Sequence, residues 1–202
     1  MATKRERADQ SAATATAPPS VRRLRRAERR EQLLAAATQA FARTGFAATS
    51  LDDIAEQAGI SRVLLYRHFD SKTDLYRAVL DRAVGRLTAA VGTRDYTYAS
   101  IDALLGAAAE DPDGFRLLFH HAAREPEFRQ QMDRFQRGMV ATARRELAKV
   151  IDDRAWTQWA AQLAPVVAIE AVMAWLDAGR PDPDQAADRI RQALGGVINA
   201  AQ

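Results

Sequence analysis

Apolar residues recur at helical spacing along most of the chain, and the first such run begins near Ala27. Its apolar positions follow one another at steps of three and four residues, which indicates a helix with one buried face. These positions are Leu33, Leu34, Ala37, Ala40 and Phe41. Gly45 follows them and predicts the end of the helix, because glycine tolerates the left-handed conformation. Residues 1 to about 20 lack this spacing and are rich in Ala, Thr, Ser and Pro, so we predict a disordered basic tail over residues 1–26.

Three serines that stand just before apolar runs predict three further helix starts. They are Ser50, Ser61 and Ser71. The first two introduce short helices over about residues 51–58 and 62–68, and the third introduces a longer helix from about Lys72. Asp53 stands three residues after the first serine, where its carboxylate completes a capping box. Gly59 lies at the tight turn between the short helices, so this segment is predicted to be a helix-turn-helix.

The rest of the chain has the same helical period. An apolar stripe runs on from Lys72 to Val91 and ends at Gly92. Later breaks are predicted where proline, glycine and aspartate gather, at Asp111–Pro112, Glu125–Pro126, 152–153 and 179–183. No alternating pattern of useful length indicates a strand. We therefore predict an all-α fold of about nine helices, with a three-helix domain over residues 27–72 and a larger helical domain over residues 73–202.

Composition narrows the classes of protein that fit this pattern. The 202 residues contain no cysteine, which excludes disulfides and thiolate metal sites and favours a reducing compartment. Residues 1–82 hold 15 basic and 10 acidic side chains, whereas the remainder holds 14 and 16, so the N-terminal part carries the basic excess expected of a nucleic-acid-binding end. No signal-peptide pattern is seen, and the apolar run over residues 155–169 is shorter than the roughly 20 residues that span a bilayer. We expect a cytoplasmic protein without a membrane anchor.

The stretch from Gly45 to Tyr76 resembles the N-terminal domain of the TetR family of bacterial regulators. The resemblance covers about residues 27–82, and its most specific residue groups are Thr49-Ser50, Ile54-Ala55, Ala58-Gly59-Ile60-Ser61, Leu65-Tyr66, His68-Phe69 and Ser71-Lys72. It implies that residues 27–72 form a DNA-binding domain and that residues 73–202 bind a ligand and form a dimer. A homodimeric repressor of a palindromic operator, released by an unidentified small molecule, is the expected function.

The second helix of a helix-turn-helix enters the major groove, so its outward side chains are the candidate DNA contacts. They are Arg62, Val63, Leu64, Tyr66 and Arg67. Arg62 is a candidate base reader, with a phosphate contact or a solvated side chain as the alternative. The family resemblance implies phosphate contacts for Thr49, Tyr66, His68 and Lys72, although His68 also fits a structural role. The bulky Val63 and Leu64 depart from the glycine and small residue common in the family, and they favour contacts with thymine methyl groups.

A run of basic residues over 22–30 precedes the first helix. Two interpretations fit this run equally well. It forms an arm that reaches into an adjacent minor groove or along phosphates, or it is a solvated run of charge.

The C-terminal domain offers candidate pocket residues without a decisive motif. The large apolar side chains among them fit either a ligand cavity or an ordinary core, which we prefer. Glu170 is a lone carboxylate amid apolar residues, for which an interface or surface role is favoured over a place in the pocket, and His120 belongs to a basic stripe that fits an anionic ligand or, as we prefer, solvent. These candidates are Phe115, Phe119, His120, Trp156, Trp159, Glu170 and Met173. The neighbouring His120 and His121 point about 100° apart on a helix, so they do not form a two-ligand metal face.

Two apolar helices near the C-terminus are candidates for a dimer interface, because one is apolar almost all round and the other contains Gly195-Gly196. Their interface candidates are Trp159, Leu163, Val167, Ile190, Leu194, Val197 and Ile198. Two such helices from each chain form a four-helix bundle about a two-fold axis in the resembled family. Burial within one subunit is the alternative.

Competing functions have weaker support in the sequence. No glycine-rich phosphate loop or cluster of metal ligands is present, so we expect no enzyme activity, no cofactor and no metal. A dimeric DNA-binding regulator without a small-molecule effector stays open as the main alternative. Repression and activation use the same DNA contacts, and repression is the commoner behaviour in the family.

Overall fold

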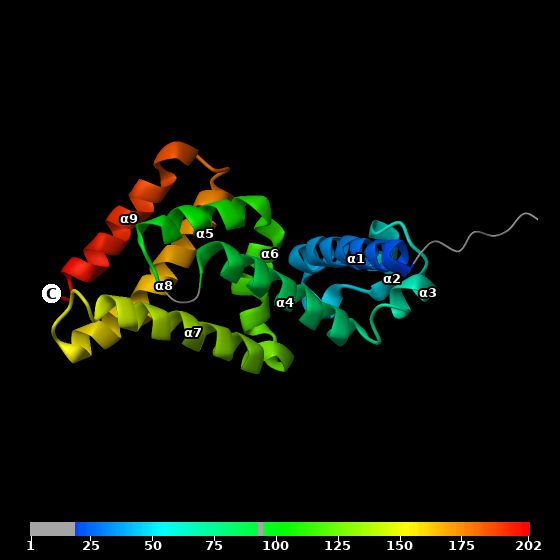
Figure 1. Ribbon diagram of the computed structural model, residues 1–202, viewed down its shortest axis with the longest axis horizontal. Coiled ribbons are helices and arrows are strands. Elements are labelled where there is room, and N and C mark those ends of the chain that lie inside the picture. The colour runs from blue at the N-terminus through cyan, green and yellow to red at the C-terminus, as the bar shows by residue number, and fades with distance from the viewer. Residues whose placement is uncertain (1–18, 93–94) are drawn as a thin grey trace, which may run out of the picture.

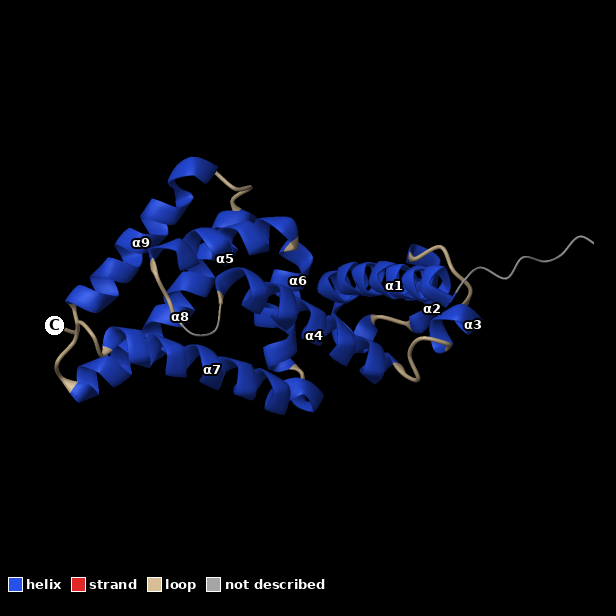
Figure 2. Ribbon diagram, viewed as in Figure 1, coloured by secondary structure: helices blue, strands red, loops and turns tan. Residues whose placement is uncertain are grey.

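The computed structural model describes residues 19–92 and 95–202 (Figures 1 and 2). These residues contain nine α-helices and no strands. The predicted all-α fold and helix number are thereby confirmed. In chain order the helices are α1 (Pro19–Ala48), α2 (Leu51–Gln57), α3 (Arg62–Tyr66), α4 (Lys72–Val91), α5 (Tyr98–Glu110), α6 (Pro112–Arg116), α7 (Arg129–Leu147), α8 (Arg154–Asp177) and α9 (Pro183–Asn199).

Helix α1 begins at Pro19, earlier than the predicted start at Ala27. The expectation of disorder therefore fails for residues 19–26, while residues 1–18 lie outside the described part of the chain. Proline is favoured in the first helical turn, and the following leucine, alanine and arginine residues are good helix formers. At the other end, Gly45 has φ 78° and ψ 171°, a conformation that is open essentially to glycine, and it kinks the helix where the sequence predicted its end.

The helices form two units joined by α4 (Figure 1). Helices α1, α2 and α3 gather at one end with the beginning of α4, and α5 to α9 form the larger body at the other end. Aromatic rings pack at the joint: the centroid of Tyr76 on α4 lies 4.8 Å from that of Phe41 on α1 and 4.4 Å from that of Phe128 in the body. All three rings are buried, so the hydrophobic core continues from one unit into the other.

Between α6 and α7 the chain departs from regular α-helix. Residues Leu117–His121 form a π-helical turn, and short 3₁₀ turns follow at Ala122–Arg124 and Pro126–Phe128. Asp111 caps the N-terminus of helix α6, and its side chain accepts a hydrogen bond from the Gly114 N–H at 3.0 Å. A Cβ atom at Gly114 would lie 2.7 Å from Asp111 Oδ2, so this cap requires glycine there.

Helix α8 packs between α7 and α9 in the body. By length and composition alone it is the one helix of the described residues that is long and apolar enough to cross a membrane, and one third of its most apolar segment is buried. Core helices of globular proteins pass the same test, and here the apolar residues divide between the core and one exposed face. That exposed face includes Trp156, Trp159 and Val166.

Candidate DNA-binding interface

Helix α2 starts at a reciprocal cap between Ser50 and Asp53. The Asp53 N–H donates to Ser50 Oγ at 3.0 Å, and the Ser50 N–H donates to Asp53 Oδ2 at 3.1 Å. The hydrogen bonds with Ser50 are the main reason that the pKa of Asp53 lies below its ordinary value. The sequence-predicted capping box is confirmed, with aspartate replacing the usual glutamate.

The turn after α2 uses the predicted glycine and serine. Gly59 has φ 63°, and the Ser61 hydroxyl accepts from the Leu64 N–H at 3.3 Å to cap α3. On α3, Leu65 points into the core and is fully buried, whereas Leu64 is half-buried at the edge. Helix α3 is therefore oriented by one buried side chain, which fixes the face it presents outward.

The outward face of α3 carries the candidate DNA contacts. The exposed fractions are 66% for Val63 and 42% for Tyr66, and Arg62 and Arg67 are also exposed. An exposed valine is costly in water, since its methyl groups find no apolar partner there. A surface that presents both methyl groups and guanidinium groups matches the methyl groups and acceptors of the major groove.

Arg62 has partners within the protein. Its Nη1 donates to Asp52 Oδ2 at 3.0 Å, Nη2 lies 3.4 Å from the Tyr66 hydroxyl, and the guanidinium carbon sits 5.6 Å from the centre of the Tyr66 ring. The pair with Asp52 is exposed, and exposed ion pairs contribute only about 0–1 kcal/mol. Arg62 can therefore exchange Asp52 for a base or phosphate at small cost.

His68 lies in the turn between α3 and α4 and is half-buried. Burial, and then the nearby Arg26, Arg30 and Arg29, hold the pKa of His68 below its ordinary value. The imidazole is therefore neutral near pH 7 and offers a hydrogen bond rather than a charge. The same neighbours show that arginines of α1 lie near the turn that follows α3, which enlarges the basic surface on this side of the domain.

Thr49 points inward. It is only 3% exposed, and its hydroxyl lies 2.6 Å from the Gly45 carbonyl oxygen and 2.7 Å from the Thr44 hydroxyl. These bonds tie the end of α1 to the start of α2. The sequence resemblance implied a phosphate contact for Thr49, but the hydroxyl is engaged inside the domain.

Lys72 also makes contacts that the sequence did not reveal. Its ammonium group donates to the carbonyl oxygens of Phe46, Ala47 and Thr49 at 2.9, 3.3 and 3.1 Å, and it lies 4.6 Å from the Phe46 ring centre. Three carbonyl groups at the end of α1 thus share one cation from the start of α4. These contacts favour a structural role for Lys72, which joins the end of α1 to the start of α4, over a phosphate contact.

Replacing Lys72 with methionine should therefore lower the free energy of unfolding by about 2 kcal/mol, because the carbonyl groups lose a charged donor. Chemical denaturation measures the change. Arg67→Met, which removes an exposed cation nearby, is the matched control and should change stability by less than about 0.5 kcal/mol. Unchanged stability together with a loss of DNA affinity in Lys72→Met would instead establish the phosphate contact.

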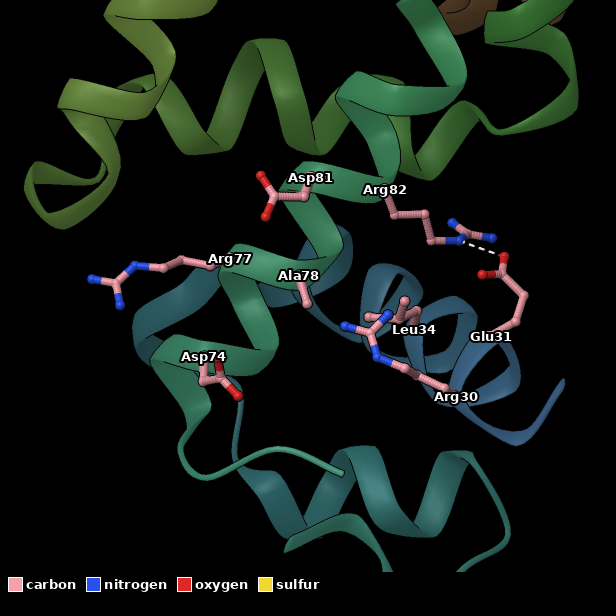
Figure 3. A pocket seen from close by; sticks show the side chains of 8 residues that line it. All are labelled: Arg30, Glu31, Leu34, Asp74, Arg77, Ala78, Asp81 and Arg82. Atoms are coloured by element: carbon pink, nitrogen blue, oxygen red, sulfur yellow. Dashed lines mark hydrogen bonds and ion pairs between the residues drawn. The ribbon is translucent and has the colours of Figure 1, made fainter. Parts of the chain in front are cut away.

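A network of ion pairs connects the DNA-binding unit to the body along α4. In a polar cleft between α1 and α4, Arg82 reaches across to Glu31 (Figure 3), with Nε 2.6 Å from Oε1. Arg82 also binds Asp111 at 3.0 Å, and Arg86 binds both carboxylates at 2.7 and 3.3 Å. Arg82 and Arg86 on α4 therefore each pair with Glu31 of the DNA-binding unit and with Asp111 of the body.

The body contains a large cavity of about 800 Å³. Its wall is mostly apolar and comes from α4, α5, α7, α8 and α9. Wall residues include Val84, Leu87, Val91, Ile101, Leu104, Phe119, Phe135, Met139, Leu147, Ala168, Ile169, Leu194 and Ile198. Its size and lining are those of sites that hold drug-sized molecules.

Only Phe119 of the seven pocket candidates from the sequence lines this cavity. Phe115 and Met173 are buried in the core, and Trp156 and Trp159 form an exposed edge-to-face pair with ring centres 5.6 Å apart. His120 Nε2 lies 3.9 Å from Glu170 Oε2, and the Glu170 side chain is exposed. Most of the wall, including Glu146 on α7, was not anticipated.

The seven candidates for the dimer interface divide between surface and interior. On α8, Trp159 is 41% exposed, and Leu163 and Val167 are half-buried. On α9, Ile190 is buried in the core, Val197 is half-buried, and Leu194 and Ile198 line the cavity. The exposed apolar surface therefore belongs mainly to α8, where Trp156 and Val166 extend it.

Within the described residues, no group of three or more histidine, cysteine, aspartate or glutamate side chains is placed to hold a metal ion.

Comparison with known proteins supports the DNA-binding interpretation. Residues 33–79 match the family described as "Bacterial regulatory proteins, tetR family". The chain is 40% identical over 107 residues to the transcriptional activator FasR of Mycolicibacterium smegmatis, a match that covers 49% of each chain. It is 35% identical over 102 residues to the transcriptional repressor KstR2 of Rhodococcus jostii, covering 48% of this chain and 50% of that protein. The matches thus span about half the length of these relatives.

The fold agrees with solved structures over a longer range. A TetR-like transcriptional regulator from Rhodococcus sp. RHA1 superposes with a TM-score of 0.70 and 22% identity, over 86% of this chain and 97% of that one. At this identity the likeness establishes the shared fold, including the body that the sequence matches leave largely uncovered.

Proposed function

We propose that the chain is a transcriptional regulator of the tetR family of bacterial regulatory proteins and that it binds a palindromic operator as a homodimer. The observation that carries the proposal is the exposed face of α3, flanked by arginines of α1. Arg62 reads a base, and Val63 contacts thymine methyl groups. Tyr66, Arg67 and His68 position the helix on phosphates. Such a regulator acts in the cytoplasm, where the DNA lies.

The exposed apolar face of α8 supports the dimer. Trp156 is 50% exposed and Val166 is 53% exposed, which is unusual for large apolar side chains on one helix face. A second copy of the chain covers this face about a two-fold axis, with α9 beside it. The two copies of α3 then meet successive major grooves of a palindromic site.

The cavity in the body supports a small-molecule effector, which shifts the equilibrium between DNA-bound and released states by its differential affinity. We propose that the protein represses transcription by occluding a promoter; one relative is named a repressor. Activation is the second candidate, because the relative with 40% identity is named an activator. A regulator that needs no effector would leave the cavity without a function.

Selection of bound DNA from a random library by the purified protein tests the proposal. We expect the wild type to select a palindromic sequence. Tyr66→Ala should bind this sequence weakly, and Arg62→Ala should show a changed base preference. Asp52→Ala is the matched control for Arg62, because it removes the partner on α2 and should leave the preference unchanged. Weak, sequence-independent binding by the wild type would overturn the proposal.

We propose that the basic run over residues 22–30 binds phosphates beside α3. Its described side chains Arg26 and Arg29 are exposed on α1, near His68. Replacing both with glutamine keeps good helix formers but removes two charges. The slope of log affinity against log salt should then become shallower by roughly 0.9 for each phosphate that the protein no longer neutralises. Electrophoretic mobility shifts at several salt concentrations measure the slope, and an unchanged slope would assign these arginines to solvent.

A further inference from the structure

One polar atom in the cavity wall has no hydrogen-bond partner. Glu146 Oε1 is fully buried and accepts no hydrogen bond within the described part of the chain, although it forms a longer ion pair with Arg145, whereas Oε2 accepts from Lys149 Nζ at 2.6 Å. Arg145 Nε lies 3.8 Å from Oε1, which is beyond hydrogen-bond distance. Glu146 is one of the residues that line the mostly apolar cavity, so its carboxylate lies in the wall with one hydrogen-bonded oxygen and one that accepts no hydrogen bond.

An unsatisfied carboxylate oxygen discriminates between ligands. Water does not reach Oε1, and a purely apolar ligand in the cavity leaves this acceptor without any donor, which is costly for a buried charged group. A ligand that brings a hydroxyl or N–H group to the same point satisfies it. A carboxylate ligand would instead place a second negative charge against Oε1.

The charges of the cavity wall oppose a cationic ligand as well. Arg134, Lys149 and Arg191 line the cavity, and Glu146 is the one acidic residue among its lining residues. Lys149 already pairs with Glu146, and Arg191 pairs with Asp102 and Asp188. Lys149 Nζ and Arg145 Nε already lie 2.6 and 3.8 Å from the two oxygens of the Glu146 carboxylate, so a protonated amine at Oε1 would meet two positive charges.

We propose that the effector is an uncharged, largely apolar molecule that donates one hydrogen bond, from a hydroxyl or amide N–H, to Glu146 Oε1. This inference rests on the proposed regulator function and specifies the ligand class of its cavity. The volume of about 800 Å³ admits a drug-sized molecule with an apolar body.

Four probes with the same decyl chain test the ligand class: decanol, decyl methyl ether, decylamine and decanoate. The rise in melting temperature with probe concentration, followed by circular dichroism, gives an apparent affinity for each. We expect decanol to bind at least about tenfold more tightly than its methyl ether, which lacks the donor, and more tightly than either charged probe. Equal affinities for decanol and its ether, or tighter binding of a charged probe, would overturn the inference.

Two variants locate the effect. Glu146→Gln keeps the shape of the side chain, but its amide can also donate to the ether oxygen, so the preference for decanol should fall below about threefold. Gly138→Leu adds a side chain to the cavity wall at a helical position with nothing within 4 Å of its Cβ, and it should abolish the shifts for all four probes. Shifts that persist in Gly138→Leu would place the probes elsewhere and overturn the assignment.

Operator binding separates this inference from the proposed function. Wild-type protein that binds its operator but responds to none of the four probes refutes the ligand class and leaves the DNA-binding function intact. Decanol binding that leaves operator affinity unchanged supports the ligand class and refutes the effector role.

Discussion

Replacing Trp159 with glutamate is expected to convert the proposed homodimer to a monomer and to abolish specific operator binding at concentrations where the wild type is saturated. Trp159 lies at the middle of the exposed apolar face of α8, edge-to-face with Trp156. Buried tryptophans at interfaces typically contribute about 2 kcal/mol or more each. In a two-fold interface every substitution occurs twice, so the dissociation constant of the dimer should rise on the order of a thousandfold.

The loss of operator binding follows from the loss of the dimer. Each monomer keeps its folded α3, but one half-site offers only half of the base and phosphate contacts. Sedimentation equilibrium measures the dimer, and mobility shifts measure the operator complex. The variant should retain weak, salt-sensitive DNA binding, since its basic surface is untouched.

Two controls make this test specific. Trp159→Phe keeps an aromatic side chain and should remain dimeric at micromolar concentrations. Ala141→Glu adds the same charge at an exposed position of α7 and should change neither assembly nor DNA binding. A glutamate variant at Trp159 that stays dimeric would show that the partner covers another surface.

The helix-turn-helix was predictable because its signals are local. Ser50 and Ser61 cap the helices that follow them, and Gly59 and Gly45 adopt backbone conformations that other residues rarely reach. These features depend on neighbours within a few positions in the chain. The outward direction of Arg62 follows from the same short-range periodicity.

The roles of Thr49 and Lys72 could not be read in this way. Whether a hydroxyl or ammonium group faces solvent depends on where the chain returns, and here the ends of α1 and α4 meet around both side chains. The early start of α1 at Pro19 was missed for another reason. Arginine and leucine favour helix, but this segment has no amphipathic pattern, so periodicity gives no signal there.

The cavity was missed because it belongs to no single helix. Five helices supply its wall, and the periodicity of one helix cannot distinguish a side chain that packs against a neighbour from one that borders a void. The large residues chosen from sequence, such as Met173, fill the core. Glu146 gave no signal, since glutamate near arginine and lysine on a helix usually indicates a solvated surface.

Removing the carboxylate of Asp111 should give the largest loss of stability of any single charge change in the joint between the two units. Its Oδ1 caps α6 through the Gly114 N–H, and its Oδ2 accepts from Arg82 and Arg86. The Arg82 side chain is only 11% exposed, so water replaces the missing partner poorly. We expect Asp111→Ala to lower the free energy of unfolding by about 3 kcal/mol, because the variant lacks the cap and breaks the partly buried ion pair.

Two further variants separate the cap from the ion pairs. Asparagine is as good an N-cap as aspartate, so Asp111→Asn should lose only the charged contribution, about half of the alanine effect. Asp113→Ala removes a carboxylate from the same first turn of α6 that pairs with neither arginine, and it should cost less than about 1 kcal/mol. Equal losses for the alanine and asparagine variants at Asp111 would assign the whole effect to the ion pairs, and equal losses at Asp111 and Asp113 would refute the network. Arg82 and Arg86 also pair with Glu31 on α1, so loss of the Asp111 carboxylate removes the ion pairs that join α4 to the body. Operator affinity measured on the same variants reports whether these ion pairs set the position of the DNA-binding unit.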